Sequence, residues 1–409
     1  MLDHVRPQYA KKFRCIGNKC EDNCCRGWDV IVDKATYQKY QALPALQPYL
    51  DEYFELITEN PSETRYALIK YTSSCVCPLL SDDQMCCLQK EYGEEYLSVT
   101  CATYPRNPRR IDGLMENPLS LSCPEAARLV LLDTQLMPSD DGKIGDRRYS
   151  RFLSMADQAT VANGNPIRFF WDIREFSLRL VQDRMYPLWQ RLFILGMFCK
   201  RLDEMITVRQ VGAVPKLLRD FAEIAAQCKL RSAMDDIPVR STVQVEMVMQ
   251  VVHRCLAHKD PRICRIQECL QDFLRGTGYD TAPYLESCTH NYVEAYTHHY
   301  EPFMQEHPFL LENYLINHIF RTRFPFGEKV GDEFDNPQRE YLLMCLEFAV
   351  IKGLLIGMAG HYREAYGVEH IVKLVQTFSK SMEHSPAIRE AINWQGLADA
   401  NSMSALLKN

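Results

Sequence analysis

The stretch FRCIGNKCEDNCCRGW, residues 13–28, places four cysteines within eleven positions. Further cysteines follow in CVCPLL (75–80), CCLQ (86–89), CATYPR (101–106) and SCPE (122–125). Ten of the 17 cysteines therefore fall by position 123, and the other seven are scattered over more than twice that length. In a reducing compartment, such crowding indicates metal ligands rather than disulfides.

The neighbours of these cysteines favour one kind of metal site. Proline follows Cys77 and Cys123, as is common at cluster ligands, because proline fixes the chain and donates no competing N–H. Zinc also binds thiolates, but the spacings lack the paired C-x2-C of zinc ribbons, and a single zinc ion would use only four ligands. We therefore expect an iron–sulfur cluster, with zinc as the alternative metal.

The first cysteine group also argues against one enzyme class. A radical methionine-cofactor enzyme needs C-x3-C-x2-C, which from Cys20 and Cys24 requires a cysteine at position 27, where the chain has Gly27. If this segment is helical, Cys20 and Cys24 lie one turn apart on one face and Cys25 points about 100° away. Glycine-rich loops for phosphates or dinucleotides are missing from the sequence.

Length, charge and hydropathy limit the other possibilities. A chain of 409 residues is long for one core, so we expect two domains. The net charge is −6 and no long basic run occurs, so nucleic-acid binding has no electrostatic support. The N-terminus lacks the pattern of a secretory signal, and no run approaches the ~18 uncharged apolar residues of a membrane span. We expect a cytoplasmic protein.

The first 137 residues read as short pieces interrupted by prolines. We expect an irregular, Cys-rich, metal-binding region in which metal coordination replaces a core. Helices are predicted at Lys34–Tyr40, after an Asp33 cap, and again after Pro124. The polar stretch Met137–Ser150 is the best candidate for a linker.

Residues 151–409 show helical periodicity and no alternating strand pattern of comparable strength. We therefore predict a mainly α protein, in which the Cys-rich region (1–137) packs on a larger all-helical domain (151–409). The predicted helical stretches are Phe170–Met205, Val243–Ala257, Cys264–Leu274, Leu310–Phe320, Tyr341–Met358 and Glu369–Met382.

Several long motifs carry a resemblance to a known family. The segments at 13–28, 77–80, 86–106 (CCLQKEYGEEYLSVTCATYPR) and 119–128 (LSLSCPEAAR) resemble the flagellin lysine-N-methylase family. The N-terminal part is also similar to the putative zinc- or iron-chelating cysteine-cluster family. The match extends through ENYLINHIFRTRFPFG (312–327), LLIGMAGHY (354–362) and SKSMEHSP (379–386), and so covers essentially the whole chain.

By this resemblance, the protein would methylate lysine ε-amines of flagellin, a protein of the bacterial flagellum, in the cytosol. The donor would be S-adenosylmethionine, the helical domain would bind donor and substrate, and a [4Fe-4S] cluster would be held by the cysteine motif. Eight positions exceed the four ligands that one cluster needs, and Cys75 and Cys87 look like additions to the pattern. The eight are Cys15, Cys20, Cys24, Cys25, Cys77, Cys86, Cys101 and Cys123.

The resemblance leaves the donor pocket and the catalytic base open. Asn313, Asn317 and Arg321 recur every four residues along one predicted helix and are candidates to bind the donor's carboxylate. The alternative is an ordinary interhelical face. Tyr104 and His384 are candidates for proton transfer, against ordinary hydrogen-bonded roles.

Other functions remain open at this point. One is a non-enzymatic zinc- or iron-binding interaction module, and another is a redox protein. Peripheral membrane association through an amphipathic helix, the number of methyl groups added and the oligomeric state also stay open.

Overall fold

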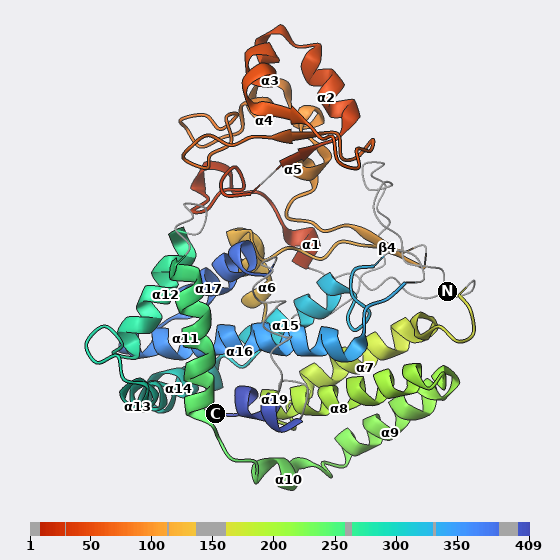
Figure 1. The fold of residues 1–409 in the computed structure, drawn as a ribbon, viewed down its shortest axis with the longest axis vertical. Coiled ribbons are helices and arrows are strands. Elements are labelled where there is room, and N and C mark those ends of the chain that lie inside the picture. The colour runs from red at the N-terminus through yellow and green to blue at the C-terminus, as the bar shows by residue number, and fades with distance from the viewer. Residues whose placement is uncertain are drawn as a thin grey trace.

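The structure is a computed structural model that describes residues 9–28, 30–112, 114–135, 161–257, 264–329, 333–383 and 400–409. The predicted linker and His384 lie outside these residues. A small Cys-rich region sits on a larger helical part, with α1 and α6 at the junction (Figure 1).

The Cys-rich region contains a small antiparallel sheet with the order β1-β3-β2. Each strand has only three residues, too few to produce the alternation by which a sequence shows strands. Helix α2 begins after Asp33, whose side chain accepts a hydrogen bond from the Thr36 N–H, so the predicted capped helix is confirmed. The elements are β1 (Val30–Val32), α2 (Lys34–Gln41), α3 (Gln47–Tyr53), β2 (Phe54–Leu56), β3 (Ala67–Ile69), α4 (Cys87–Tyr92) and α5 (Val99–Thr103).

This region has its own hydrophobic core, so the expectation that metal coordination replaces a core is wrong. The core joins the inner faces of β1 and β3 to α2, α3 and α4, and Trp28, Tyr37 and Tyr71 pack against it. Its buried members are Val30, Val32, Tyr40, Leu46, Leu50, Ala67, Ile69, Cys77, Leu79 and Leu88.

The last part of the N-terminal region belongs to the main core instead. Strand β4 (Arg109–Ile111) pairs with β5 (Leu114–Glu116), and the chain then enters α6 (Pro124–Leu131), with proline in the first turn as predicted. Helix α1 (Tyr9–Lys12) packs against α6. Burial of α6 in the main core fixes this end of the Cys-rich region on the helical part.

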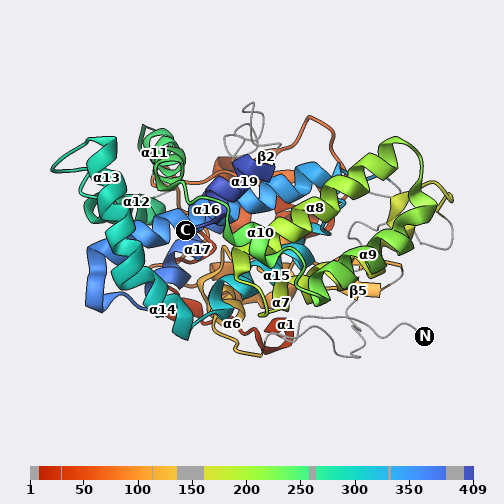
Figure 2. The same ribbon diagram turned by 90° about the horizontal axis from the view of Figure 1, so that it is seen from below.

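The larger part is helical in the described residues. Seen from below, α8 and α9 lie on one side and α11, α12 and α13 on the other, with α16 between them (Figure 2). The helices are α7 (Phe170–Gln182), α8 (Leu188–Thr207), α9 (Val214–Ala226), α10 (Arg231–Asp235), α11 (Ser241–Ala257), α12 (Cys264–Gly276), α13 (Leu285–Ala295), α14 (Glu301–Glu306), α15 (Phe309–Thr322), α16 (Pro337–Tyr362), α17 (Val368–Ser381) and α19 (Ala400–Leu407).

Helix α16 is the central helix of this part. It contacts α8, α11, α12, α13, α15, α17 and α19. The stretch Pro337–Ala365 is long and apolar enough to cross a membrane by length and composition, but its most apolar window is 89% buried inside the protein. Such burial is typical of a core helix, since a helix that is hydrophobic all round needs cover on every side.

The mainly helical fold is confirmed, and the predicted stretches from Val243 onward coincide with α11, α12, α15, α16 and α17. The stretch Phe170–Met205 is divided into α7 and α8, because Pro187 caps α8 and disfavours a helical residue before it. The segment Cys20–Cys25 is not helical: a 3-10 turn at Gly17–Lys19 precedes it and the chain then turns.

Candidate functional site

Five thiols from four segments of the chain converge next to the small sheet. Two short antiparallel bridges bring them together, one joining Arg26 to Val76 and the other joining Leu80 to Cys86. The Cys77 N–H donates to the Cys25 carbonyl at 2.8 Å, which places these two residues side by side. We call the five the thiol group: Cys24, Cys25, Cys77, Cys86 and Cys101.

Their mutual electrostatics confirm the closeness. A hydrogen bond with the Cys25 thiol raises the pKa of Cys24. Cys24 lowers the pKa of Cys25, but the Cys77 thiol and burial outweigh it and raise that pKa. Burial also raises the pKa of Cys101 to about 12, with further contributions from Cys24 and Cys86. Cys24, Cys25 and Cys101 are therefore neutral thiols, and a bound metal would favour their thiolates.

The Tyr71 hydroxyl is a buried polar group beside the thiol group. The Tyr71 OH is buried and has no hydrogen-bond partner among the described residues. After burial itself, Cys77, Cys25 and Cys101 are the largest causes that raise its pKa, so it lies close to them. A buried donor without an acceptor is costly, and cluster sulfur would accept a hydrogen bond from this hydroxyl. The donor set therefore fits a thiolate-bound cluster.

The remaining predicted ligands lie at the edge of this group or away from it. Cys123 lies near Cys20 and Cys24, which both contribute to its raised pKa. Cys15 is exposed, and its Sγ accepts a hydrogen bond from the Gly17 N–H at 3.4 Å. In the described part of the chain, no three His, Cys, Asp or Glu side chains have the geometry that holds a single metal ion. Metal binding therefore stays a prediction.

A cavity of about 520 Å³ lies between the Cys-rich region and the helical part. The first contributes Trp28, Tyr104 and Arg106 to its lining, and the second contributes Arg321 and Lys380. Its volume falls within the roughly 300–1,000 Å³ of small-molecule sites. We call it the junction cavity.

One wall of the junction cavity is aromatic. The ring centroids of Trp28 and Tyr104 are 5.2 Å apart, with 34° between the ring planes. Trp28 donates from Nε1 to the Cys24 carbonyl at 2.5 Å, so the loop that carries the thiols also fixes this ring. The Tyr104 hydroxyl pairs with the Ser122 hydroxyl at 3.0 Å. Burial raises the pKa of Tyr104 well above its usual value, so the phenol stays neutral and is unsuited to remove a proton.

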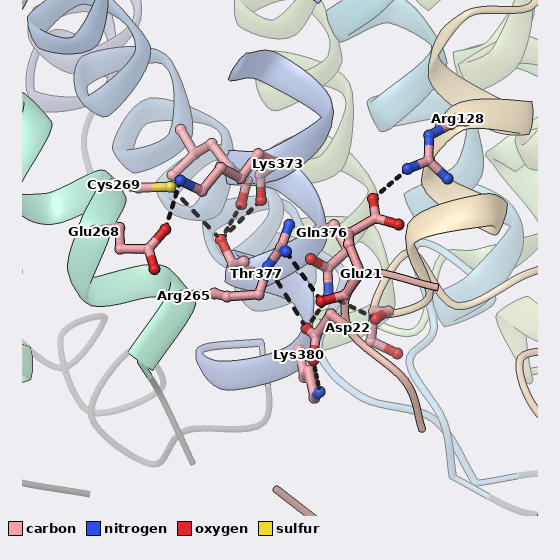
Figure 3. Close-up of polar contacts among 12 residues, drawn as sticks. Glu21, Asp22, Arg128, Arg265, Glu268, Cys269, Lys373, Gln376, Thr377 and Lys380 are labelled. Carbon is pink, nitrogen blue, oxygen red and sulfur yellow. Dashed lines mark hydrogen bonds and ion pairs between the residues drawn. The ribbon is translucent and has the colours of Figure 1, made fainter. Parts of the chain in front are cut away.

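The cysteine loop is held on the helical part by Glu21 and Asp22 (Figure 3). Asp22 accepts hydrogen bonds from Lys380 at 2.5 Å and from Gln376 at 2.8 Å, both on α17. Glu21 forms an ion pair with Arg128 of α6, and its carbonyl accepts from Arg265 of α12 at 3.3 Å. Three helices thus fix the segment between Cys20 and Cys24.

Lys380, the partner of Asp22, also borders two cavities. A second cavity of about 410 Å³ is lined by Cys20, Asp22, Cys75 and Lys380, among others. Lys380 lines both cavities. A movement of this ion pair would change both spaces.

The three predicted donor-binding residues all lie on α15, but their side chains have different partners. The Asn313 amide donates to the carbonyls of Leu131 and Asp133, at 3.3 and 2.7 Å. The Asn317 amide donates to the Leu119 carbonyl at 3.2 Å. Both side chains are buried and hold the end of the Cys-rich region on α15, and neither lines the junction cavity.

Arg321 does line the cavity, but it is already paired. Its guanidinium contacts Glu383 at 3.0 Å, and both side chains are buried. The sequence analysis assigned no site role to Trp28, Asp22 or Lys380. Trp28, Asp22 and Arg106 lie within the cysteine motifs, and Lys380 lies within SKSMEHSP. That position in the motifs is the signal by which they could have been found.

Known proteins that are similar to this chain belong to the same family that these motifs resemble. The FliB lysine N-methylase C-terminal domain family matches residues 174–407. The chain is 23% identical to "Lysine-N-methylase" proteins of Salmonella choleraesuis and Salmonella typhimurium, over 94% of its length and 92% of theirs. It is 34% identical to the "Flagellar biosynthetic protein FliU" of Salmonella muenchen, over 34% of this chain and 83% of that protein. No solved structure matches the chain. The chain belongs to the FliB lysine N-methylase family.

Proposed function

We propose that this protein is an S-adenosylmethionine-dependent methyltransferase that modifies lysine ε-amino groups of flagellin in the cytoplasm, and that its thiol group holds a [4Fe-4S] cluster. Membership of a lysine N-methylase family supports the methyl transfer. Similarity to the flagellar biosynthetic protein FliU supports a flagellar substrate. The observation that carries the proposal is the junction cavity, which has the volume of a small-molecule site and an aromatic wall.

The reaction sets clear chemical requirements. The lysine ammonium, with a pKa of ~10.4 in water, must first lose a proton to solvent. Its nitrogen lone pair then forms a bond to the methyl carbon while the carbon–sulfur bond breaks, and S-adenosylhomocysteine leaves as a neutral thioether. Alignment of nitrogen, carbon and sulfur is the main contribution an enzyme makes here. A cavity with fixed walls serves that alignment.

The residues of the cavity divide these tasks. The neutral Tyr104 phenol and the Trp28 indole present apolar faces that exclude water from a bound donor. Glu328 brings a carboxylate to the helical side of the cavity, where it would attract the substrate ammonium. Asp33 also lines the cavity, but it already accepts three hydrogen bonds from Thr36 and Val99 as the cap of α2.

The four ligands of the cluster would come from among Cys24, Cys25, Cys77, Cys86 and Cys101, with Tyr71 as a hydrogen-bond donor beside them. When bound, the cluster would supply a covalent anchor between the segments and a centre for one-electron chemistry. Because Trp28 donates to the Cys24 carbonyl, a cluster that fixes the position of Cys24 would also fix the aromatic wall of the cavity.

The test is methylation of flagellin by anaerobically purified protein with methyl-labelled donor. Cys86→Ser and Cys87→Ser form a matched pair, because the two cysteines are neighbours and only Cys86 belongs to the thiol group. We expect wild type and Cys87→Ser to contain iron and transfer methyl groups to lysine, and Cys86→Ser to lose both. Full transfer by iron-free wild type would remove the cluster from the proposal, and absence of transfer by iron-loaded wild type would contradict the activity.

A further inference from the structure

We propose that the junction cavity binds the methyl donor in one orientation, with the donor's carboxylate on Arg106 and its sulfonium against the rings of Trp28 and Tyr104. The identity of the donor rests on the proposed function. The orientation is inferred from the charges and rings of the cavity itself.

Among the described residues, three cationic side chains line the cavity, and two of them already form ion pairs within the protein. Arg321 is paired with Glu383 at 3.0 Å. Lys380 is paired with Asp22 at 2.5 Å. A donor carboxylate would have to compete with a carboxylate of the protein at both positions, and the displaced charge would be left buried.

Arg106 differs from these two cations in its contacts. Its guanidinium lies over the Phe13 ring, with Cζ 5.0 Å from the centroid, and its Nη2 reaches the Phe13 carbonyl only at 3.5 Å. No carboxylate partner of Arg106 occurs among the described residues. A guanidinium stacked on a ring keeps its fork of N–H donors available for a carboxylate, and such bidentate pairs are strong and directional. Arg106 is therefore the cation best placed to bind the amino-acid end of the donor.

The aromatic wall suits the other charge of the donor. A cation against the face of tryptophan or tyrosine is attracted by the ring quadrupole, and the attraction is larger where water is excluded. Trp28 is fixed by the Cys24 carbonyl and Tyr104 by Ser122, so both faces are in place before a ligand arrives. Because the Tyr104 phenol stays neutral, this wall carries no negative charge that would trap the cation in an ion pair.

Tyr104 and Arg106 are two residues apart, on either side of Pro105, so the two subsites come from one short segment. The sulfur and the carboxylate of the donor are separated by only three carbon atoms. A single segment can therefore serve both groups. Because the two contacts come from different side chains, each can be removed by its own substitution.

Calorimetry with three ligands tests the orientation on the folded, full-length protein. S-adenosylmethionine has both the sulfonium and the carboxylate, S-adenosylhomocysteine has only the carboxylate, and methylthioadenosine has neither. For Arg106→Gln we expect affinity for the first two ligands to fall about 10- to 100-fold, and affinity for methylthioadenosine to change less than about threefold. For Trp28→Leu we expect the preference for the sulfonium over the thioether to fall about 3- to 30-fold.

Two further variants serve as controls for the charge and for the position of Arg106. Arg110→Gln removes an exposed arginine of β4 that does not line the cavity, and should bind all three ligands like wild type. Arg106→Lys keeps the charge without the fork and should bind S-adenosylhomocysteine with intermediate affinity. Equal effects of Arg106→Gln on all three ligands, or no effect, would overturn the orientation while wild-type methylation still supports the activity. Absence of binding of every ligand to folded wild type would overturn both.

Discussion

Asp22 accepts a hydrogen bond at 2.5 Å from Lys380, a residue 358 positions later in the chain. Both side chains are about one-tenth exposed. The pair fixes the loop between Cys20 and Cys24 on the end of α17, and its Lys380 lines two cavities. It is the direct link between the cysteine motif and the C-terminal motif.

We expect Lys380→Met to reduce methyl transfer strongly and to lower the free energy of unfolding by about 1–3 kcal/mol, because Asp22 would stay buried with one partner fewer. Lys373→Met is the matched control on the same helix. Its ion pair with Glu268 at 2.7 Å is more exposed, so its loss should cost less than about 1 kcal/mol. Urea unfolding and transfer rates check both, and equal effects of the two variants would contradict the special role of Lys380.

Tyr71→Phe should affect the free energy of unfolding in metal-free protein and the reduction potential in cluster-loaded protein. In metal-free protein the change removes a buried hydroxyl that lacks a partner, so the free energy of unfolding should stay the same or rise. In cluster-loaded protein it should make the reduction potential more negative, because a hydrogen bond to cluster sulfur stabilises the reduced state. Potentiometry and denaturant unfolding measure the two effects. A loss of stability in the metal-free variant together with an unchanged potential would show that the hydroxyl does not face a cluster.

Tyr104→Phe separates a proton-transfer role from an aromatic one. Since burial holds the pKa of this phenol far above neutrality, we expect the variant to keep methyl transfer within about tenfold and to keep the pH profile. Tyr104→Leu should instead weaken donor binding, because the aromatic face is lost. Complete loss of activity in Tyr104→Phe, with donor binding intact, would restore Tyr104 as a catalytic acid or base.

Lys352 should make stability depend on pH. Burial in α16 lowers the pKa of Lys352 from 10.5 to about 7, while its Nζ donates to the Leu407 carbonyl at 2.8 Å. The folded chain therefore holds this proton less tightly than the unfolded chain. The corresponding stability is fully present above pH 10.5 and is lost as the pH falls to about 7.

We accordingly expect wild type to gain stability relative to Lys352→Met as the pH rises from 7 to 9, by up to about 1.4 kcal/mol per pH unit. Urea unfolding of both proteins at several pH values measures the difference. A constant difference across this range would show that the buried amine keeps an ordinary pKa.

Local sequence features determined many of the elements. The Asp33 cap before α2 and the proline in the first turn of α6 begin helices where they were predicted, since caps and prolines act through neighbouring backbone groups. The long apolar stretches of α15 and α16 also predicted helices correctly. The strands of the small sheet were missed because three residues carry no period, and their pairing depends on contacts across the chain.

The sequence alone therefore determined that the cysteines are crowded, that the bulk of the chain is helical and which motifs carry the family resemblance. Only the tertiary structure decided which thiols converge, because β-bridges between distant segments place Cys25 beside Cys77. It also showed that Asn313 and Asn317 hold the fold together, that Arg321 is paired with Glu383 and that Arg106 faces the cavity without a carboxylate partner among the described residues. The physical reason is that the availability of a polar side chain depends on its partners, and here those partners lie far away in the sequence.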